Sequence, residues 1–149
     1  MRPPEEEIRL LVAEWIKKAD LDFKTAVRLS AEGEFRDIVG FHAQQVAEKY
    51  LKALLTRHQI EFPKTHVIRR LLILLERADP TMADALDEAN WLSPFGAEIR
   101  YPGDRAEALP GEEVRARQLA QKVRDAVMDV LDPYLAAGRF GVPFAPGSR

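Results

Sequence analysis

The spacing of the prolines is the feature that most constrains how this chain can fold. Proline lacks a backbone N–H and clashes with the preceding turn of a helix, so prolines mark where helices begin or end. Ten prolines occur among the 149 residues, yet none falls between residues 5 and 62. Shorter proline-free intervals follow at 64–79, 81–93 and 111–132. We expect the helices to lie in these four intervals.

Apolar residues recur every three or four positions in the first interval, which predicts a long first helix. Glu5, Glu6 and Glu7 suit the positive end of its dipole, and Gly33 is suited to end it. The apolar stripe of this helix consists of Ile8, Leu11, Val12, Trp15, Ala19, Phe23 and Ala26.

A second helix is predicted from about Glu34. Gly40 inside it should cost about 1 kcal/mol relative to alanine, and the close approach of another helix would compensate. Its predicted apolar face consists of Val39, Ala43, Val46, Tyr50 and Leu54.

Three further helices are predicted: one capped by Thr65, one beginning at Thr81, and one from Gly111 to about Leu131. No sustained alternation of apolar and polar residues indicates a strand. The sequence therefore predicts an all-α, four- or five-helix up-and-down bundle over residues 1–135. Residues 136–149 contain three glycines and two prolines and are predicted to be a flexible C-terminal tail. The predicted buried sides are Val67, Leu71, Leu72 and Leu75; Met82, Ala85, Leu86 and Ala89; and Val114, Ala120, Val123, Val127 and Val130.

Composition excludes several classes of function. The chain has no cysteine, which excludes disulfide scaffolds, thiolate zinc sites and cysteine nucleophiles. The start, MRPPEEE, is unlike a signal peptide, and no apolar run reaches the roughly 18 residues of a membrane span, so a cytoplasmic protein without membrane contact is expected. The net charge of −2 argues against a uniformly basic nucleic-acid binder. This near-neutral total is the sum of unequal segments: residues 42–72 carry a net charge of +4 and residues 73–113 a net charge of −7. The basic segment is therefore compatible with a local phosphate site.

Polar residues form two adjacent stripes along the second helix. One interpretation is a solvated face, stiffened by a Glu48–Lys52 pair worth about 0.3–0.5 kcal/mol. The other is a polar strip that anchors the loop after the fourth helix, or that faces another subunit. The stripes consist of Gln44, Glu48 and Lys52, and of His42, Gln45 and Lys49.

The segment 91–105, WLSPFGAEIRYPGDR, combines prolines, glycines and aromatic residues, which is typical of a rigid, exposed binding loop. Arg100 and Tyr101 can present a cation and a ring to a phosphate and a base. Alternatively, Tyr101 packs on the bundle end and Arg100 pairs with Glu48. His66 is interpreted as a half-buried residue that bonds nearby backbone. No histidine spacing indicates a metal site, and no nucleotide-loop or hydrolase motif occurs, so no cofactor is predicted.

Four stretches make the chain resemble the HEPN family of small all-α domains. They occur in the family's order and cover residues from about 10 to 131. They are the first helix with Trp15, Ala19, Asp20 and Leu21; FHAQQVAEKYLKALL at 41–55; FPKTHVIRRLL at 62–72; and IRYP at 99–102.

The resemblance implies a bundle that dimerises and is often encoded beside, or fused to, a minimal nucleotidyltransferase in toxin–antitoxin pairs. Many members are metal-independent ribonucleases whose motif is an arginine followed four to six residues later by a histidine. Arg100 matches that arginine, but no histidine follows His66 in the sequence. Loss of such an acid–base group typically costs about 10²–10⁴-fold in rate.

The expectation is therefore a non-catalytic HEPN-like module that binds a nucleotide, an RNA or a protein partner, works as a homodimer, and pairs with a minimal nucleotidyltransferase. One alternative is a diverged ribonuclease in which His42, His66 or Glu48 replaces the missing histidine. Another is a helical dimer without a ligand. The expected ligand-binding residues are Arg100, Tyr101, Gln45, Glu48, Lys49 and Lys52.

Overall fold

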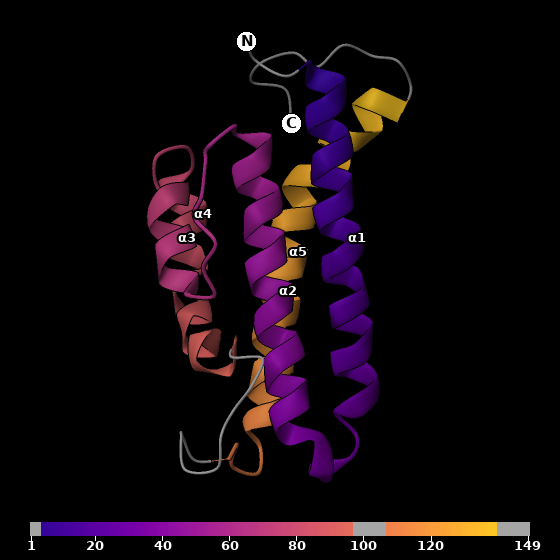
Figure 1. Ribbon diagram of the computed structural model, residues 1–149, viewed down its shortest axis with the longest axis vertical. Coiled ribbons are helices and arrows are strands. Elements are labelled where there is room, and N and C mark those ends of the chain that lie inside the picture. Colours follow the sequence, from indigo (N-terminus) through magenta and orange to yellow (C-terminus); the bar gives the residue numbers. More distant parts are fainter. Residues whose placement is uncertain (1–3, 97–106, 140–149) are drawn as a thin grey trace.

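The computed structural model describes residues 4–96 and 107–139, which form a bundle of helices (Figure 1). Over these ranges the chain contains five α-helices, two 3-10 helices and no strand, which confirms the predicted all-α bundle. None of these helices is both long and apolar enough to span a membrane. The elements are α1 (Glu5–Leu29), η1 (Gly33–Phe35), α2 (Arg36–Arg57), α3 (Ile68–Leu75), α4 (Pro80–Ala85), η2 (Asp87–Gly96) and α5 (Glu112–Arg139).

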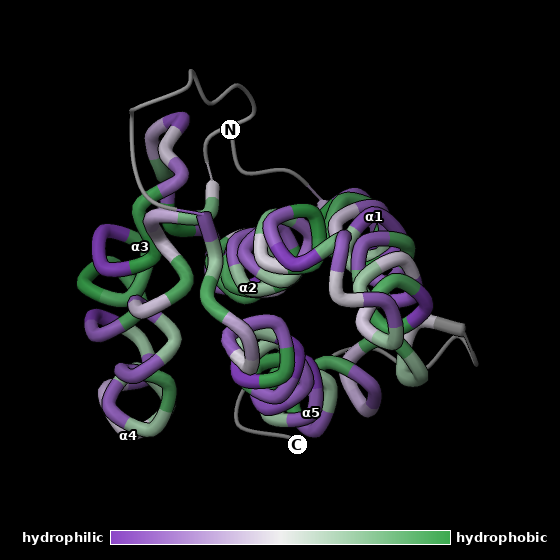
Figure 2. The backbone as a smooth tube through the Cα atoms, turned by 90° about the horizontal axis from the view of Figure 1, so that it is seen from below, coloured by the Kyte–Doolittle hydropathy of each residue, from purple (hydrophilic) through white to green (hydrophobic). Residues whose placement is uncertain are grey.

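Helix α2 lies at the centre of the bundle. It packs against α1 and α5 on one side and against α3 and η2 on the other, while α4 contacts α3 and η2 (Figures 1 and 2). From Ala43 to Leu55, Lys49 is the one residue of α2 that is not buried. A helix with neighbours on every side has no solvated face. The interpretation of the polar stripes as a solvated face is therefore wrong.

Helix α1 presents a narrower apolar stripe than the sequence predicted. Ile8, Val12, Ala19 and Ala26 are buried, but Leu11 is 52% exposed. The helix ends at Leu29, where the N–H of its C-cap residue, Ser30, donates to the Ala26 carbonyl. Gly33 therefore does not end α1, and it begins η1 instead.

The first turn of α3 is capped from elsewhere in the chain. Thr65 does not cap the helix itself; its hydroxyl accepts from the N–H of Val67, the residue before α3. The next two backbone N–H groups donate to η2 side chains: Ile68 to Ser93 Oγ at 2.9 Å, and Arg69 to Asn90 Oδ1 at 2.9 Å.

Two of the predicted buried positions near these short helices are exposed. Val67 is 42% exposed, and Ala85, the last residue of α4, is also exposed. The fourth helix begins at Pro80 rather than Thr81, and the Asp79 side chain caps it by accepting from the Met82 N–H.

Helix α5 extends further than predicted. It continues through Pro133 to Arg139, so residues 136–139 are helical rather than part of a tail. Tyr134 explains the extension: it is 4% exposed, and its hydroxyl donates to Glu5 Oε1 at 2.7 Å. Burial, and then this bond to a carboxylate, raise the pKa of Tyr134. At the other end Val114 is 39% exposed rather than buried. The predicted flexibility concerns residues 140–149, which lie outside the described residues.

Gly40 of α2 faces an aromatic ring at very short range. A Cβ atom at this position would lie 2.2 Å from Cδ1 and 2.7 Å from Cε1 of Phe95, a buried residue of η2. The predicted close approach is therefore present, and the approaching group is a ring of η2. Glycine is required here because the ring occupies the space of any side chain.

Gly40→Ala is expected to destabilise the protein by about 1–3 kcal/mol, since the added methyl group overpacks the contact with Phe95. Helix propensity alone predicts the opposite sign, a gain of about 1 kcal/mol. Urea denaturation measures the difference. Gly33→Ala is the control, because a Cβ there meets only the flexible guanidinium of Arg36, at 3.0 Å. A Gly40→Ala protein more stable than the parent would contradict this packing.

Candidate functional site

The candidate site is the polar part of α2, and it is built around the Glu48 carboxylate. Glu48 is only 4% exposed. Its Oε2 accepts from Lys52 Nζ at 2.9 Å, and its Oε1 accepts from Gln44 Nε2 at 3.2 Å and pairs with His66 Nδ1 at 2.8 Å. Both carboxylate oxygens are thus satisfied inside the protein, as a buried charge requires.

Two glutamines complete this network. Gln44 Nε2 also donates to the His66 backbone carbonyl at 2.7 Å, and Gln45 Nε2 donates to Gln44 Oε1 at 2.8 Å. His66 is therefore held at both its ring and its backbone, while its side chain stays 56% exposed. The interpretation of His66 as a half-buried residue bonding backbone is wrong, since its ring bonds a buried carboxylate.

Lys52 reaches Glu48 through an aromatic enclosure. Its ammonium group lies 5.5 Å from the centre of the Trp15 ring and 5.7 Å from that of Phe62. The two rings pack edge to face at 6.1 Å. A cation between ring faces is attracted by their electron density, which compensates part of its lost hydration. Trp15 belongs to α1 and Phe62 to the 58–67 connection, so the network joins three segments.

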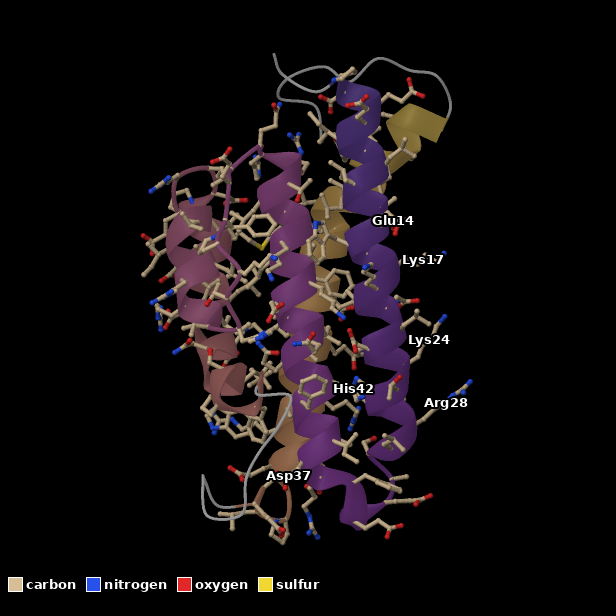
Figure 3. All side chains as sticks on the ribbon, in the orientation of Figure 1. Glu14, Lys17, Lys24, Arg28, Asp37 and His42 are labelled. Carbon is tan, nitrogen blue, oxygen red and sulfur yellow. The ribbon has the colours of Figure 1, made fainter. Side chains whose placement is uncertain are left out.

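A second carboxylate, Asp22 of α1, repeats the same arrangement toward α2. Its Oδ2 accepts from Lys49 Nζ at 2.5 Å, and its Oδ1 pairs with His42 Nδ1 at 2.8 Å. Figure 3 shows His42 on the side of α2 that faces α1. Burial opposes the charge of Asp22, but the hydrogen bonds and charges of His42 and Lys49 outweigh it and lower the pKa of this carboxyl.

The end of η2 rests directly on this network. A Cβ added to Gly96 would lie 2.8 Å from the amide carbon of Gln44, so the η2 backbone is in contact with that side chain. Gly96 is the last described residue before the segment 97–106, in which the predicted ligand residues Arg100 and Tyr101 lie outside the described residues. The polar strip is thus an anchor for the element that leads into this segment.

The remaining predicted ligand residues lie together on α2. Three of them, Gln45, Glu48 and Lys52, are buried and belong to the hydrogen-bond network around the Glu48 carboxylate. The fourth, Lys49, has a side chain that is 21% exposed, and it pairs with Asp22. The sequence reasoning missed the role of Asp22. The signal was available, because Asp22 stands three residues after Ala19 on the buried side of α1, where a lone carboxylate needs a partner.

Most cations of the basic segment 42–72 are already engaged. Lys49 and Lys52 pair with Asp22 and Glu48, Arg69 pairs with Asp87, and Arg57 lies over the Tyr134 ring. The exposed cations of this segment are Lys64 and Arg70. Lys17, Lys24 and Arg28 point outward from α1 on the side away from α2 (Figure 3). The segment charge of +4 therefore overstates the number of cations of this segment that a ligand could meet.

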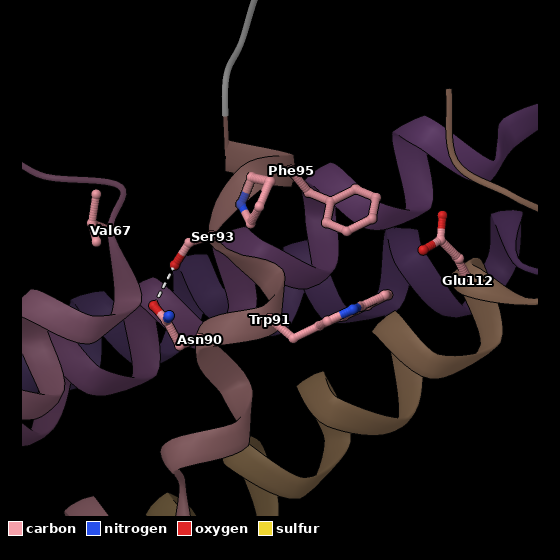
Figure 4. A pocket seen from close by; sticks show the side chains of 7 residues that line it. Val67, Asn90, Trp91, Ser93, Phe95 and Glu112 are labelled. Carbon is pink, nitrogen blue, oxygen red and sulfur yellow. Dashed lines mark hydrogen bonds between the residues drawn. The ribbon is translucent and has the colours of Figure 1, made fainter. Parts of the chain in front are cut away.

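A groove of about 310 Å³ lies beside the site, between η2 and the start of α5 (Figure 4). Phe95 and Trp91, with ring centres 5.3 Å apart, form its aromatic part, and the Arg115 guanidinium lies 4.3 Å from the Trp91 ring. Residues 91–96 belong to η2, in which Leu92, Phe95 and Gly96 are buried, so this part of the predicted exposed loop is helical. Among the described residues that line the groove, Glu112 is the ionisable one, and the cation of Arg115 lies on the Trp91 ring. It is lined by Val67, Asn90, Trp91, Ser93, Pro94, Phe95 and Glu112.

Over the described ranges no three histidine or carboxylate side chains form a group that could hold a metal ion. The chemistry of the site is instead that of two carboxylates, each compensated by a lysine and a histidine.

The family model of the HEPN domain matches residues 12–132, which include α2 with its complete network. The chain belongs to the HEPN domain family. The resemblance stated from the sequence is thereby confirmed. No curated protein and no solved structure matches this HEPN chain. The match begins within α1 and ends within α5, and it includes α2, α3, α4 and η2 in full.

Glu48→Gln is expected to destabilise this HEPN domain by about 3–5 kcal/mol, because it leaves the Lys52 ammonium group buried without a counter-charge. Adding Lys52→Met to that variant should recover much of the loss, since the orphaned charge is then removed as well. Chemical denaturation of the single and double variants measures the coupling. Glu88→Gln, which breaks an exposed pair with Lys122, is the control and should cost at most about 1 kcal/mol. If the stability losses of Glu48→Gln and Lys52→Met simply added in the double variant, the result would contradict the pairing.

Asp22→Asn is expected to cost about 1–3 kcal/mol at neutral pH, because Lys49 and His42 lose a charged acceptor. The pKa of Asp22 is lowered in the folded state, so its stabilisation is complete above the unfolded value of about 4 and is lost as the pH falls below it. The stability difference between parent and variant should therefore shrink below about pH 4. Asp20→Asn, whose side chain is 31% exposed, is the control with a smaller effect. A difference that stays constant on acidification would argue against the assignment.

Proposed function

We propose that this HEPN chain is a binding module that holds a phosphate-bearing ligand, a nucleotide or an RNA, beside the exposed His66 ring without cleaving it. The observation that supports the proposal is a fixed polar network whose exposed member is the His66 ring, at the place where η2 leads into the segment carrying Arg100.

The charges of the network behind His66 are compatible with an anion. Asp22 and Glu48 are each compensated by a lysine, so the network carries no excess negative charge that would repel a phosphate. Arg100 and Tyr101 would supply a guanidinium for the phosphate and a ring for the base. Lys64, two residues before His66, adds an exposed cation.

Binding without cleavage is proposed because the family's catalytic histidine is missing after Arg100. Glu48 is a poor substitute, since it is buried and both of its oxygens are engaged. A diverged ribonuclease is the second candidate, and one observation favours it: the exposed ring of His66 is oriented by a carboxylate, as a general base would be. RNA cleavage without added metal, lost in both Arg100→Ala and His66→Asn, would establish that candidate.

Homodimerisation and pairing with a minimal nucleotidyltransferase stay predictions of the family resemblance. Light scattering of the purified chain tests the first. Co-purification with the product of an adjacent nucleotidyltransferase gene tests the second.

Calorimetric titration with ATP, GTP and a short RNA is the test of ligand binding. We expect at least one of them to bind, and Arg100→Ala to weaken its binding about tenfold or more, as loss of a charge-assisted hydrogen bond does. Arg77→Ala is the matched control, because Arg77 is an exposed arginine of the same acidic segment, just after α3. Absence of heat with all three ligands would reject the proposal, and equal weakening by both variants would reject the role of Arg100.

A further inference from the structure

The exposed residue His66 is held by two hydrogen bonds, one at its ring and one at its backbone. Its Nδ1 lies 2.8 Å from Glu48 Oε1, and its carbonyl accepts from Gln44 at 2.7 Å. Both partners are themselves buried, and Lys52 holds the other oxygen of Glu48. The ring is therefore fixed on one edge while more than half of its side chain is open to solvent.

The bond to Glu48 determines the proton on the ring. An ionised carboxylate can only accept, so Nδ1 carries the hydrogen. In the neutral ring Nε2 then has a lone pair and no hydrogen. A phosphate oxygen also only accepts, so it cannot bond a neutral His66 at Nε2. It can do so once Nε2 is protonated.

We propose that His66 contacts the phosphate of the bound ligand through Nε2–H and takes up a proton from solvent as the ligand binds. This inference rests on the proposed function and names the residue and the protonation step of the same site. The imidazolium lies between Glu48 and the phosphate, and these two negative groups stabilise its charge. Binding and protonation are therefore linked, and each favours the other.

The charged groups of the elements that adjoin His66 bear on this linkage. On α2 they are Glu48, which attracts the proton, and Lys52, which neutralises part of that attraction. On its own segment Lys64 is exposed, and on α3 Arg69 is paired with Asp87 of η2. Before the ligand arrives, Glu48 is already shared with Lys52. The phosphate adds a second negative group beside the ring.

The experiment is calorimetric titration of a short RNA that lacks terminal phosphates, so that the ligand does not titrate over the range used. Titrations in two buffers of different ionisation enthalpy give the number of protons taken up. We expect the number of protons taken up to approach one per site as the pH is raised, and the affinity to fall with rising pH by at most about tenfold per pH unit.

His66→Asn is the informative variant, because its side-chain amide nitrogen can replace Nδ1 toward Glu48 while Nε2 is removed. It should abolish the proton uptake and the pH dependence and weaken binding about tenfold at neutral pH. His58→Asn, at the end of α2, is the control and should change neither.

The outcomes separate the two proposals. RNA binding without proton uptake, unchanged in His66→Asn, would overturn the role of His66 and leave the binding function intact. Absence of binding by RNA and by both nucleotides would overturn both. Loss of folding in His66→Asn would be recognised by circular dichroism, and the buffer comparison on the parent protein then decides alone.

Discussion

The burial of one carboxylate, Glu48, is the constraint on which the rest of this arrangement depends. A buried carboxylate is stable in its charged form only where its oxygens accept hydrogen bonds from nearby donors. Glu48 meets this condition by recruiting Lys52 and Gln44 from its own helix and His66 from the connection that follows it. Lys52 in turn requires the rings of Trp15 and Phe62. Several segments must therefore be in place at once for the charge to be stable.

The helices were predictable because their signals are local. Proline positions and apolar periodicity predicted the all-α bundle, and the family's sequence stretches predicted its type. Periodicity could not show that the polar stripes of α2 are buried, because a solvated stripe and an internally paired stripe have the same sequence spacing. Nor could it show the continuation of α5 past Pro133, since that depends on Tyr134 meeting Glu5, 129 residues earlier.

The sequence allowed the residues of the candidate site to be predicted, but it did not allow their solvent accessibility to be predicted. The sequence singled out Gln45, Glu48, Lys49 and Lys52, which do lie together, but as members of internal networks. Segment charge is a poor guide here because it counts every cation equally, whether it faces a carboxylate, a ring or water. What distinguishes His66 is the combination of a buried partner with an open ring, and neither property is encoded in its immediate neighbours in the chain.

The capping of α3 by η2 has a consequence for local unfolding of this protein. An eight-residue helix is too short to persist alone, and its first amides are satisfied by Asn90 and Ser93, more than twenty residues further along. If η2 detached, those N–H groups would lose their acceptors, and α3 would unfold with it. The two elements should therefore open and close as one cooperative unit, and their amide hydrogens should exchange with solvent at a common rate while α2 remains protected.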